Sequence, residues 1–266
     1  MRGARALSAD AGNGGRAELL AAVEVGLGAA LATAGRIERL GAFDLHLVPT
    51  AHPLLRSTAL PREEPADWAG ALPRLIAVAR AVGCRPRVEL VADLRPRLRA
   101  ALARSGFHRR LGAPLLIARP GPGGFPAAAC RALTADTPIG LLDRFLETQH
   151  ALFGEAPPGP AERALLRHCL ERGELRSWTV LEADRPIAAA SLLGGPFVAE
   201  LAALWTVPDH RRRGHGRTVA RAARAGHAVE GGRIAWAVAT GAASAALLEE
   251  LGFDRIGTFE IWETEP

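Results

Sequence analysis

Two segments of this 266-residue chain carry the same succession of patterns at an offset of 146 positions. In each segment, an apolar stretch typical of a strand is followed by a helical pattern and then by a Gly-Phe turn. These turns are Gly106-Phe107 and Gly252-Phe253, and the same offset places residues 88–91 on 234–237. A pattern that recurs at a fixed spacing indicates an internal duplication, although an alanine-rich chain also produces chance matches. We therefore expect two copies of one domain.

A stretch rich in proline and glycine, residues 119–126, separates the two segments. Such composition is typical of an interdomain linker. The length of the chain also exceeds the usual size of one domain, about 100–200 residues. The sequence thus predicts an N-terminal domain at 1–120, a linker at 121–130 and a C-terminal domain at 131–266.

Hydrophobic periodicity predicts alternating strands and helices in both domains. In the N-terminal domain the expected strands are 43–50, 87–92 and 113–118, the expected helices are 67–82 and 95–105, and the start of the chain reads as an amphipathic helix. In the C-terminal domain the expected helices are 140–153, 161–171, 214–229 and 242–251, and the expected strands are 177–182, 187–193, 198–207, 233–239 and 257–262. The alternation predicts an α/β fold with a mixed (α+β) sheet flanked by helices in each domain.

Composition narrows the classes of function. Hydrophobic residues make up 48% of the chain and charged residues 23%, which is the balance of a globular protein. The net charge of +5 is modest and aromatic residues are only 5%, so nucleic-acid binding is not expected. No apolar run approaches a membrane span. The three cysteines, Cys84, Cys130 and Cys169, have neither disulfide nor zinc spacing, and we expect a cytoplasmic protein.

The most informative local feature lies where the expected strand 198–207 meets the expected helix 214–229. Residues 208–217 read Pro-Asp-His-Arg-Arg-Arg-Gly-His-Gly-Arg. Gly214 and Gly216 have no Cβ atom, so backbone N–H groups at the helix start can approach an anion closely, assisted by the helix dipole. Three arginines add forked donors that suit phosphate oxygens: Arg212, Arg213 and Arg217.

Two other interpretations of this loop compete with an anion site. In a dinucleotide-binding fingerprint the third small residue would fall on Val219, and three arginines would stand between the strand and the first glycine. The tight strand-to-helix turn of that fingerprint has no room for three arginines, so we exclude a dinucleotide-binding fingerprint here. The arginine run could also be a solvated helix start, and from the loop alone this alternative stays open.

Residues 206–216, Thr-Val-Pro-Asp-His-Arg-Arg-Arg-Gly-His-Gly, resemble the acetyl-CoA signature of the GCN5-related N-acetyltransferase (GNAT) superfamily. That signature is Gln or Arg-x-x-Gly-x-Gly or Ala, and its defined positions are occupied here by Arg211, Gly214 and Gly216. A later strand at 234–239 and the ending Leu-Gly-Phe of the next helix at 251–253 also match the family in order. The resemblance covers about 130 residues and implies a GNAT-type acyltransferase domain.

The resemblance implies where acetyl-CoA binds. Its pyrophosphate would lie on the glycine loop. In the family, the strand before the loop and the strand after the next helix splay apart, and pantetheine would enter this gap and pair with the backbone of the first strand. The expected cofactor-binding residues are Leu204, Trp205, Thr206, Val207, Arg211, Arg212, Arg213, Gly214, His215, Gly216 and Arg217. No metal is implied, and His210, His215 and His227 lack ligand spacing.

The N-terminal domain resembles the degenerate first domain of tandem GNAT proteins, through residues 43–49 and 105–107. Where its first strand ends it has only Thr-Ala-His-Pro-Leu-Leu, at 50–55, and no Arg-x-x-Gly-x-Gly. We therefore expect this domain to bind no acyl-CoA. It would instead support the fold or shape the acceptor cleft.

Transfer to an amine requires removal of a proton, because an amine with a pKa of about 10 is protonated at neutral pH. Glu200, on the expected cofactor strand, is the first candidate base. Glu155, between the expected helices 140–153 and 161–171 of the C-terminal domain, is the second. Either could instead be a surface residue. The family's usual general acid is a Tyr, and Leu248 stands at its position in a chain without tyrosine; Gly241 replaces an Asn that commonly opens the same helix.

The sequence therefore predicts an N-acetyltransferase that uses acetyl-CoA, with a primary amine of a small molecule as acceptor. The alternative is a protein that senses acyl-CoA without turnover, which the missing acid favours. Trp205 and Trp236 lie on strands and are expected to line the core or a substrate pocket.

Overall fold

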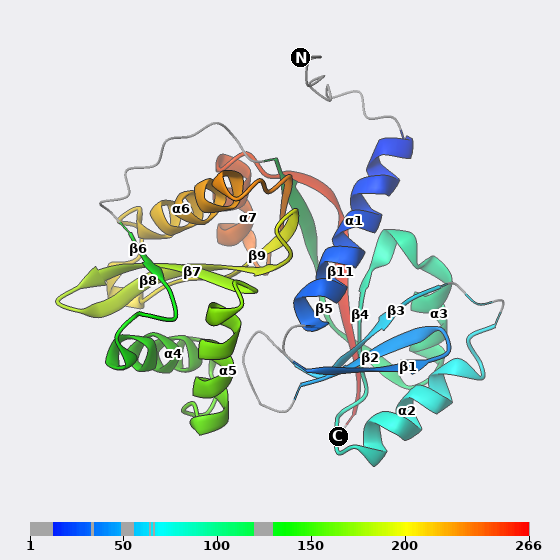
Figure 1. Ribbon diagram of the computed structural model, residues 1–266. Helices are drawn as coiled ribbons and strands as arrows, with labels where there is room; N and C mark the ends of the chain where they lie inside the picture. Colours follow the sequence, from blue (N-terminus) through cyan, green and yellow to red (C-terminus); the bar gives the residue numbers. More distant parts are fainter. Residues whose placement is uncertain are drawn as a thin grey trace.

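The computed structural model describes residues 13–32, 35–48, 56–63, 65, 67–119 and 130–265. Within these residues the strands form a single 11-stranded mixed sheet in the order β1-β2-β3-β4-β11-β5-β10-β9-β8-β7-β6 (Figure 1). The predicted linker at 121–130, except for Cys130, and residues 50–55 lie outside the described part.

The sheet is built from strands of both halves of the chain. The first five are β1 (Arg36–Leu40), β2 (Phe43–Leu47), β3 (Thr58–Pro61), β4 (Arg87–Val91) and β5 (Phe107–Ala118). The others are β6 (Arg131–Leu133), β7 (Leu175–Glu182), β8 (Arg185–Gly194), β9 (Val198–Thr206), β10 (Ile234–Val238) and β11 (Asp254–Thr264).

Seven α-helices accompany these strands in the described residues. They are α1 (Asn13–Ala32), α2 (Ala71–Ala81), α3 (Pro96–Arg104), α4 (Ile139–Phe153), α5 (Pro160–Glu171), α6 (His215–Val229) and α7 (Ala242–Glu250). Two short 3₁₀ turns, η1 (Ala92–Leu94) and η3 (Pro208–His210), follow β4 and β9. No helix in the described residues is both long and apolar enough to cross a membrane.

Local chemistry accounts for the helix ends. Pro160 begins α5, where a missing N–H costs nothing, and Glu162 accepts a hydrogen bond from the Gly159 N–H at 2.9 Å. The helix α4 ends at Gly154, whose φ of 70° is the left-handed conformation that glycine adopts without strain. Both helices pack their apolar faces on the sheet, where most of their stabilisation arises.

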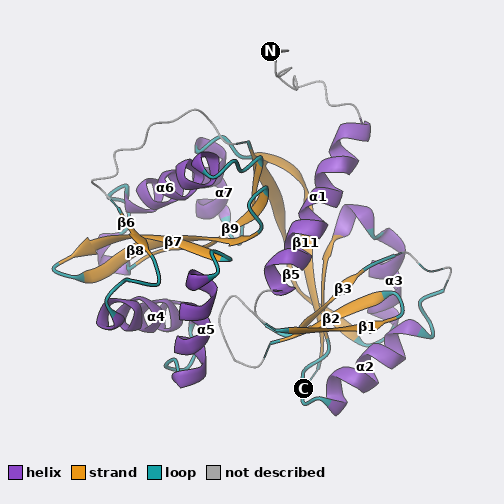
Figure 2. Cartoon of the chain, in the orientation of Figure 1, coloured by secondary structure: helices purple, strands orange, loops and turns teal. Residues whose placement is uncertain are grey.

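The helices cover the sheet in layers, which Figure 2 shows around β7, β8 and β9, with α6 on one face and α4 on the other. Helix α1 crosses the middle of the molecule and contacts β8 and β9 as well as β4 and β11. The contact is close at Gly26, because a Cβ atom there would lie 2.7 Å from the Val198 side chain. A buried stripe on α1, formed by Leu20, Val23, Leu27, Ala30 and Leu31, faces the sheet.

The two halves of the chain are interlocked through β5 and β11. β5 belongs to the first half but lies between β10 and β11, and β11 belongs to the second half but lies between β4 and β5. The two strands pair antiparallel along almost their whole length, from Phe107 opposite Thr264 to Ile117 opposite Asp254. Each half therefore completes the sheet of the other.

The structure repeats the offset seen in the sequence. Helices α3 and α7 have the same length, and α7 begins and ends 146 positions after α3. Each of them precedes one of the two central strands, β5 and β11, and each follows a strand that pairs with the opposite central strand. This arrangement agrees with an internal duplication in which the final strands of the two copies pair with one another.

Most predicted elements are confirmed with shifts of a few residues at their ends, and the α/β class is confirmed. Three short strands were not predicted: β1, β3 and β6. β1 is rich in charge and largely exposed, and β3 and β6 have only four and three residues, too few for a periodic signal. β5 begins six residues earlier than expected. Residues 108–112 at its start are mostly exposed and polar, so they carry no apolar strand pattern, and their pairing with β11 makes them part of the strand.

A buried carboxylate fixes the β5–β11 pair. The Glu260 side chain on β11 is fully buried, and its two oxygens accept hydrogen bonds from Arg99 of α3 at 2.9 and 3.0 Å. Arg109 of β5 donates to Oε1 at 3.1 Å, and the Trp262 indole N–H donates to Oε2 at 2.9 Å. One residue of the second half is thus held by two arginines of the first.

We predict that Glu260→Gln lowers the free energy of unfolding by about 3 kcal/mol, the lower end for breaking a buried ion pair, because both arginines are partly exposed to water. Urea denaturation of the variant measures the change. The control is Glu265→Gln, since this carboxylate is exposed and lies 3.7 Å from His108. Equal stability of the two variants would contradict the role assigned to Glu260.

Candidate functional site

The strands β9 and β10 pair at one end and then separate. Their parallel ladder joins Ile234 to Val198 and ends where Trp236 lies opposite Glu200. Beyond this point each strand keeps only its other neighbour: β10 remains paired with β5, and β9 remains paired with β8. The backbone of β9 from residue 201 onward is therefore left with one unpaired edge, which can accept an extended ligand as an additional strand.

A β-bulge marks the part of β9 beside this gap. Two residues of β9, Ala203 and Leu204, lie opposite the single residue Ala190 of β8. Ala203 has a φ of 45°, which is unusual for a residue with a side chain. A bulge increases the local bend and twist of a strand, and here it turns β9 away from β10.

The loop between β9 and α6 presents backbone N–H groups at the same end of the gap. Arg212 has a φ of 61° and Gly214, the residue before α6, has a φ of 85°. Alternation of left-handed and ordinary conformations turns successive N–H groups toward one side, which makes an anion-binding concavity. Gly214 has no side chain to cap the helix, so the first N–H groups of α6 remain available to a ligand.

The structure divides the predicted loop arginines into two kinds. Arg211 donates from Nε to the Thr206 carbonyl at 3.1 Å and closes the end of β9. Arg217 lies 2.5 Å from Glu250 of α7, so it joins the two helices that border the gap. Arg212 and Arg213 are exposed, and in the described part of the chain neither side chain forms a hydrogen bond or an ion pair.

The remaining predicted cofactor residues lie along this strand and loop. Trp205 is buried and its ring lies 5.8 Å from that of Phe145 on α4, so only its backbone can reach a ligand in the gap. Leu204 packs with the core under α6 and also lines the cavity described below. His215 is the first residue of α6, and its ring lies 6.2 Å from that of His210.

A cavity of about 290 Å³ passes through the gap between the strands. Thr240, Ser244 and Leu248 line it near α7, whereas Leu27 and Leu31 of α1 line it on the other face of the sheet. The bulge residues of β9, Ala203 and Leu204, also line it. A ligand that lies beside α7 could therefore meet a second ligand that lies beside α1.

Glu200 lies where the strands separate and lines this cavity. Burial raises the pKa of its carboxyl group to about 8, and the negative charge of Glu89 contributes to the increase. Glu89 and Arg87, both on β4, line the same cavity. At pH 7 Glu200 is therefore mostly protonated in the free protein, and it can accept a proton once it ionises.

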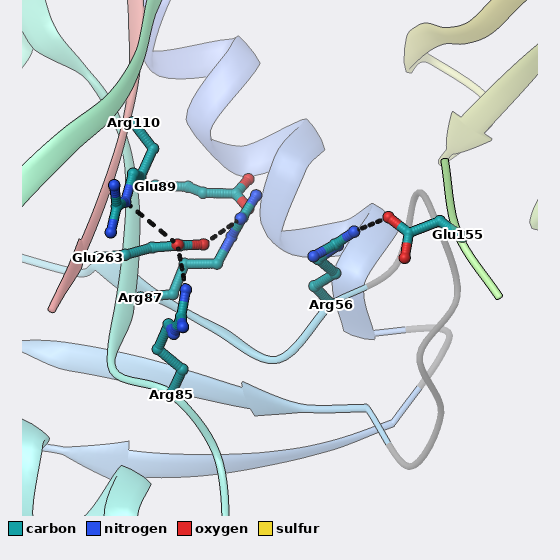
Figure 3. A network of polar contacts seen from close by, with 7 residues as sticks. All are labelled: Arg56, Arg85, Arg87, Glu89, Arg110, Glu155 and Glu263. Atoms are coloured by element: carbon teal, nitrogen blue, oxygen red, sulfur yellow. Dashed lines mark hydrogen bonds and ion pairs between the residues drawn. The ribbon is translucent and has the colours of Figure 1, made fainter. Parts of the chain in front are cut away.

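Glu89 belongs to a polar network that Figure 3 shows beside α1. Arg87 contacts Glu89 at 2.8 Å and Glu263 at 2.7 Å. Arg85 and Arg110 also contact Glu263. Partial burial would raise the pKa of Glu263, but Arg87 and Arg85 together hold it below the usual value.

Glu155 lies apart from this cavity. It follows α4 and forms an ion pair with Arg56, which joins the two halves of the chain (Figure 3). The residues that line the cavity include Phe153 but not Glu155.

The position of the expected general acid is occupied by a buried apolar side chain. Leu248 is buried and lines the same cavity as Glu200, so no phenol is present there. Thr240 and Ser244 contribute hydroxyls to the lining of this cavity. Ser244 also caps α7 by accepting a hydrogen bond from the Gly241 N–H at 3.1 Å.

The sequence indicated that the first half could shape the acceptor cleft, but it did not identify the residues of that half that line the cavity. Arg87, Glu89, Leu27 and Leu31 line it together with residues of the second half. One signal was available, because Glu89 interrupts the otherwise apolar run Val88 to Val91 of a buried strand. A carboxylate at such a position needs a partner or a function.

Comparison with known proteins agrees with this geometry. Residues 142–253 match the model of the acetyltransferase (GNAT) family. A GCN5-related N-acetyltransferase from Kribbella flavida is 21% identical with a TM-score of 0.71, covering 93% of this chain and 96% of that one. A putative GNAT-family acetyltransferase from Novosphingobium aromaticivorans is 22% identical with a TM-score of 0.57, covering 91% and 96%.

A tandem GNAT protein from the clavulanic acid biosynthesis pathway has a similar architecture, with 17% identity, a TM-score of 0.56, and coverage of 86% of this chain and 82% of that one. At these identities the similarity concerns the fold. No curated protein sequence matches the chain significantly.

The raised pKa of Glu200 predicts a pH-dependent stability. Between the unfolded pKa, near 4.5, and about 8, the folded protein retains a proton that the unfolded chain releases. The free energy of unfolding therefore falls as the pH rises through this window, by at most about 1.4 kcal/mol per pH unit. Glu200→Gln cannot ionise, so its stability relative to the wild type should increase from pH 5 to pH 8 and level off above.

Urea denaturation at pH 5, 7 and 9 measures this difference. Glu249→Gln, on the exposed side of α7, is the control and should show no comparable slope, because that side chain lies in water. A constant difference between Glu200→Gln and the wild type over this range would contradict the prediction.

Proposed function

Since residues 142–253 form a domain of the acetyltransferase (GNAT) family, a family of acyl-transfer proteins, we propose that this protein transfers an acetyl group from acetyl-CoA to a primary amine of a small molecule. The observation that carries the proposal is the cavity between β9 and β10. Glu200, with a pKa of about 8, lines this cavity, and the strand β9 that borders it runs directly into the glycine loop.

The open edge of β9 and the glycine loop fit acetyl-CoA as the donor. The N–H groups before and within the first turn of α6 would bind the pyrophosphate, and Arg212 and Arg213 would add charge. The unpaired backbone of Leu204 to Val207 would pair with the amides of pantetheine. Acetyl-CoA would then supply the acyl group as a thioester.

Glu200 would act as the base for the acceptor. An ammonium ion beside Glu200 favours the carboxylate form, so binding of the acceptor lowers the pKa of Glu200 and prepares it to receive a proton. The neutral amine can then attack the thioester carbon. Of the two protons that the nitrogen loses, one passes to Glu200, and the other is available to the thiolate that leaves.

The lack of an acid at Leu248 is compatible with slow turnover. A thiol of pKa about 8.5 leaves as a thiolate without full protonation, so loss of the acid costs on the order of 100-fold rather than all activity. The same feature favours the second candidate, a protein that binds acyl-CoA as a sensor.

Incubation of the protein with acetyl-CoA and a pooled amine library distinguishes the two candidates. Thiol release and the mass of the products are measured. The enzyme releases thiol in the presence of an amine, and the sensor binds acetyl-CoA without release.

Gly216→Val should weaken acetyl-CoA binding by more than about 10-fold. Gly216 is the second residue of α6, and its Cβ atom would lie in ordinary contact with Thr206, 3.4 Å away, so the fold should persist while the branched side chain fills the space of the phosphate. Calorimetry measures the affinity and should give one site per chain.

The matched control is Gly140→Val, because Gly140 is the second residue of α4 and has similar free space. It should bind acetyl-CoA as the wild type does. Unchanged affinity in a folded Gly216→Val protein would place the pyrophosphate elsewhere, and two equivalent sites would contradict a degenerate first half.

Glu200→Gln should separate chemistry from donor binding. The variant keeps size and hydrogen bonding but has no basic carboxylate, so turnover should fall about 100-fold at neutral pH while acetyl-CoA affinity persists. The ratio of wild-type to variant rates should shrink as the pH approaches the pKa of the amine, because solution then supplies neutral amine. Full activity of the variant from pH 7 to 10 would exclude Glu200 as the base and leave Glu155 or water for that role.

A further inference from the structure

Carboxylates from both halves of the chain line one cavity. Glu200 comes from β9 in the second half, and Glu89 comes from β4 in the first. The rest of the lining on the side of α1 and the central strands is mainly apolar, formed by Leu27, Leu31, Leu111, Phe259 and Ile261. Arg87 also lines the cavity and is paired with Glu89 and Glu263. A cavity with apolar walls and two acids, of which Glu89 keeps one oxygen atom free of this pairing, suits a ligand that has a cationic group on an apolar body.

Glu89 is bound at one oxygen atom. Both contacts from Arg87, from Nε at 2.9 Å and from Nη2 at 2.8 Å, go to Oε1. Within the described part of the chain, no hydrogen bond or ion pair reaches Oε2. The ion pair with Arg87 keeps Glu89 oriented, and Figure 3 shows the side chain extending from β4 toward α1 with its carboxylate beside the guanidinium.

The two acids act on each other across the cavity. Glu89 is only 8% exposed, and its negative charge adds to the effect of burial that raises the pKa of Glu200 to about 8. Two carboxylates in a poorly solvated site repel one another unless a proton or another cation lies between them. In the free protein the proton on Glu200 relieves this repulsion, and a bound ammonium group could replace it.

We propose that Glu89 is a second acceptor-binding residue, supplied by the N-terminal half, and that Oε2 of Glu89 together with Glu200 receives the acceptor as an ammonium ion. This inference rests on the proposed function in one respect, which is that it takes this cavity as the acceptor site. Glu89 then determines specificity, because it selects a cationic acceptor over a neutral molecule of the same shape. The degenerate half thereby contributes directly to substrate recognition.

The test compares n-hexylamine, which is a cation at pH 7, with n-hexanol, a neutral molecule of nearly the same size. Their affinities for the protein saturated with CoA are measured by calorimetric titration. The wild type should prefer the amine by at least about 10-fold, as expected for one charge-assisted hydrogen bond of about 1.5–3 kcal/mol. In Glu89→Gln this preference should fall to about 3-fold or less.

Glu263→Gln is the matched control, because Glu263 contacts the same Arg87 but does not line the cavity. It should keep the preference of the wild type. Should Glu89→Gln fail to fold, Glu89→Asp keeps the charge, withdraws it from the cavity, and should give an intermediate preference.

Three results would overturn the inference: no preference in the wild type, an unchanged preference in the Glu89 variant, or an equal loss in Glu263→Gln. Acetylation of an amine is measured separately. A wild-type protein that transfers no acetyl group would refute the proposed function, whereas the selectivity of binding still decides the role of Glu89.

Discussion

The antiparallel pairing of β5 with β11 is the interaction on which the rest of the structure depends. It places a strand of each half inside the sheet of the other half, so the hydrogen bonds at the centre of the molecule all cross between them. Glu260 adds a buried ionic contact with Arg99 and Arg109 to the same pair. β10 pairs with β5, so these contacts also hold β10, which is one of the two strands that border the gap.

The gap between β9 and β10 follows from this constraint. β10 is held by β5 on one side, while β9 is held by β8 and bent by the bulge at Ala203, so the two strands cannot remain paired beyond Glu200. The space that results has apolar walls and a small number of polar groups. An open strand edge, helix N–H groups and a carboxyl group of raised pKa are therefore brought to one place by strand geometry alone.

The contribution of the first half to this space changes its chemistry. Without Glu89 and Arg87, the cavity would contain a single acid in largely apolar surroundings. With them, the ionisation of Glu200 depends on a charge from a strand that is distant in the sequence. Helix α1 closes the same space from the other face, packed on β9 at Gly26. The first half therefore shapes the cavity that the strands of the second half border.

The sequence by itself determined the class of fold, the order of most elements and the position of the glycine loop. The fold class and the order of elements follow from local periodicity, and the loop is marked by Gly214, whose φ of 85° favours glycine, and by Gly216 two residues later. It also determined that Leu248 stands where a Tyr is usual in the family. The exchange of β5 and β11, the ion pairs of Glu155 with Arg56 and of Arg217 with Glu250, and the meeting of Glu89 with Glu200 were decided only by the tertiary structure. Local patterns report which face of an element is buried, but they do not report which distant strand supplies its neighbour.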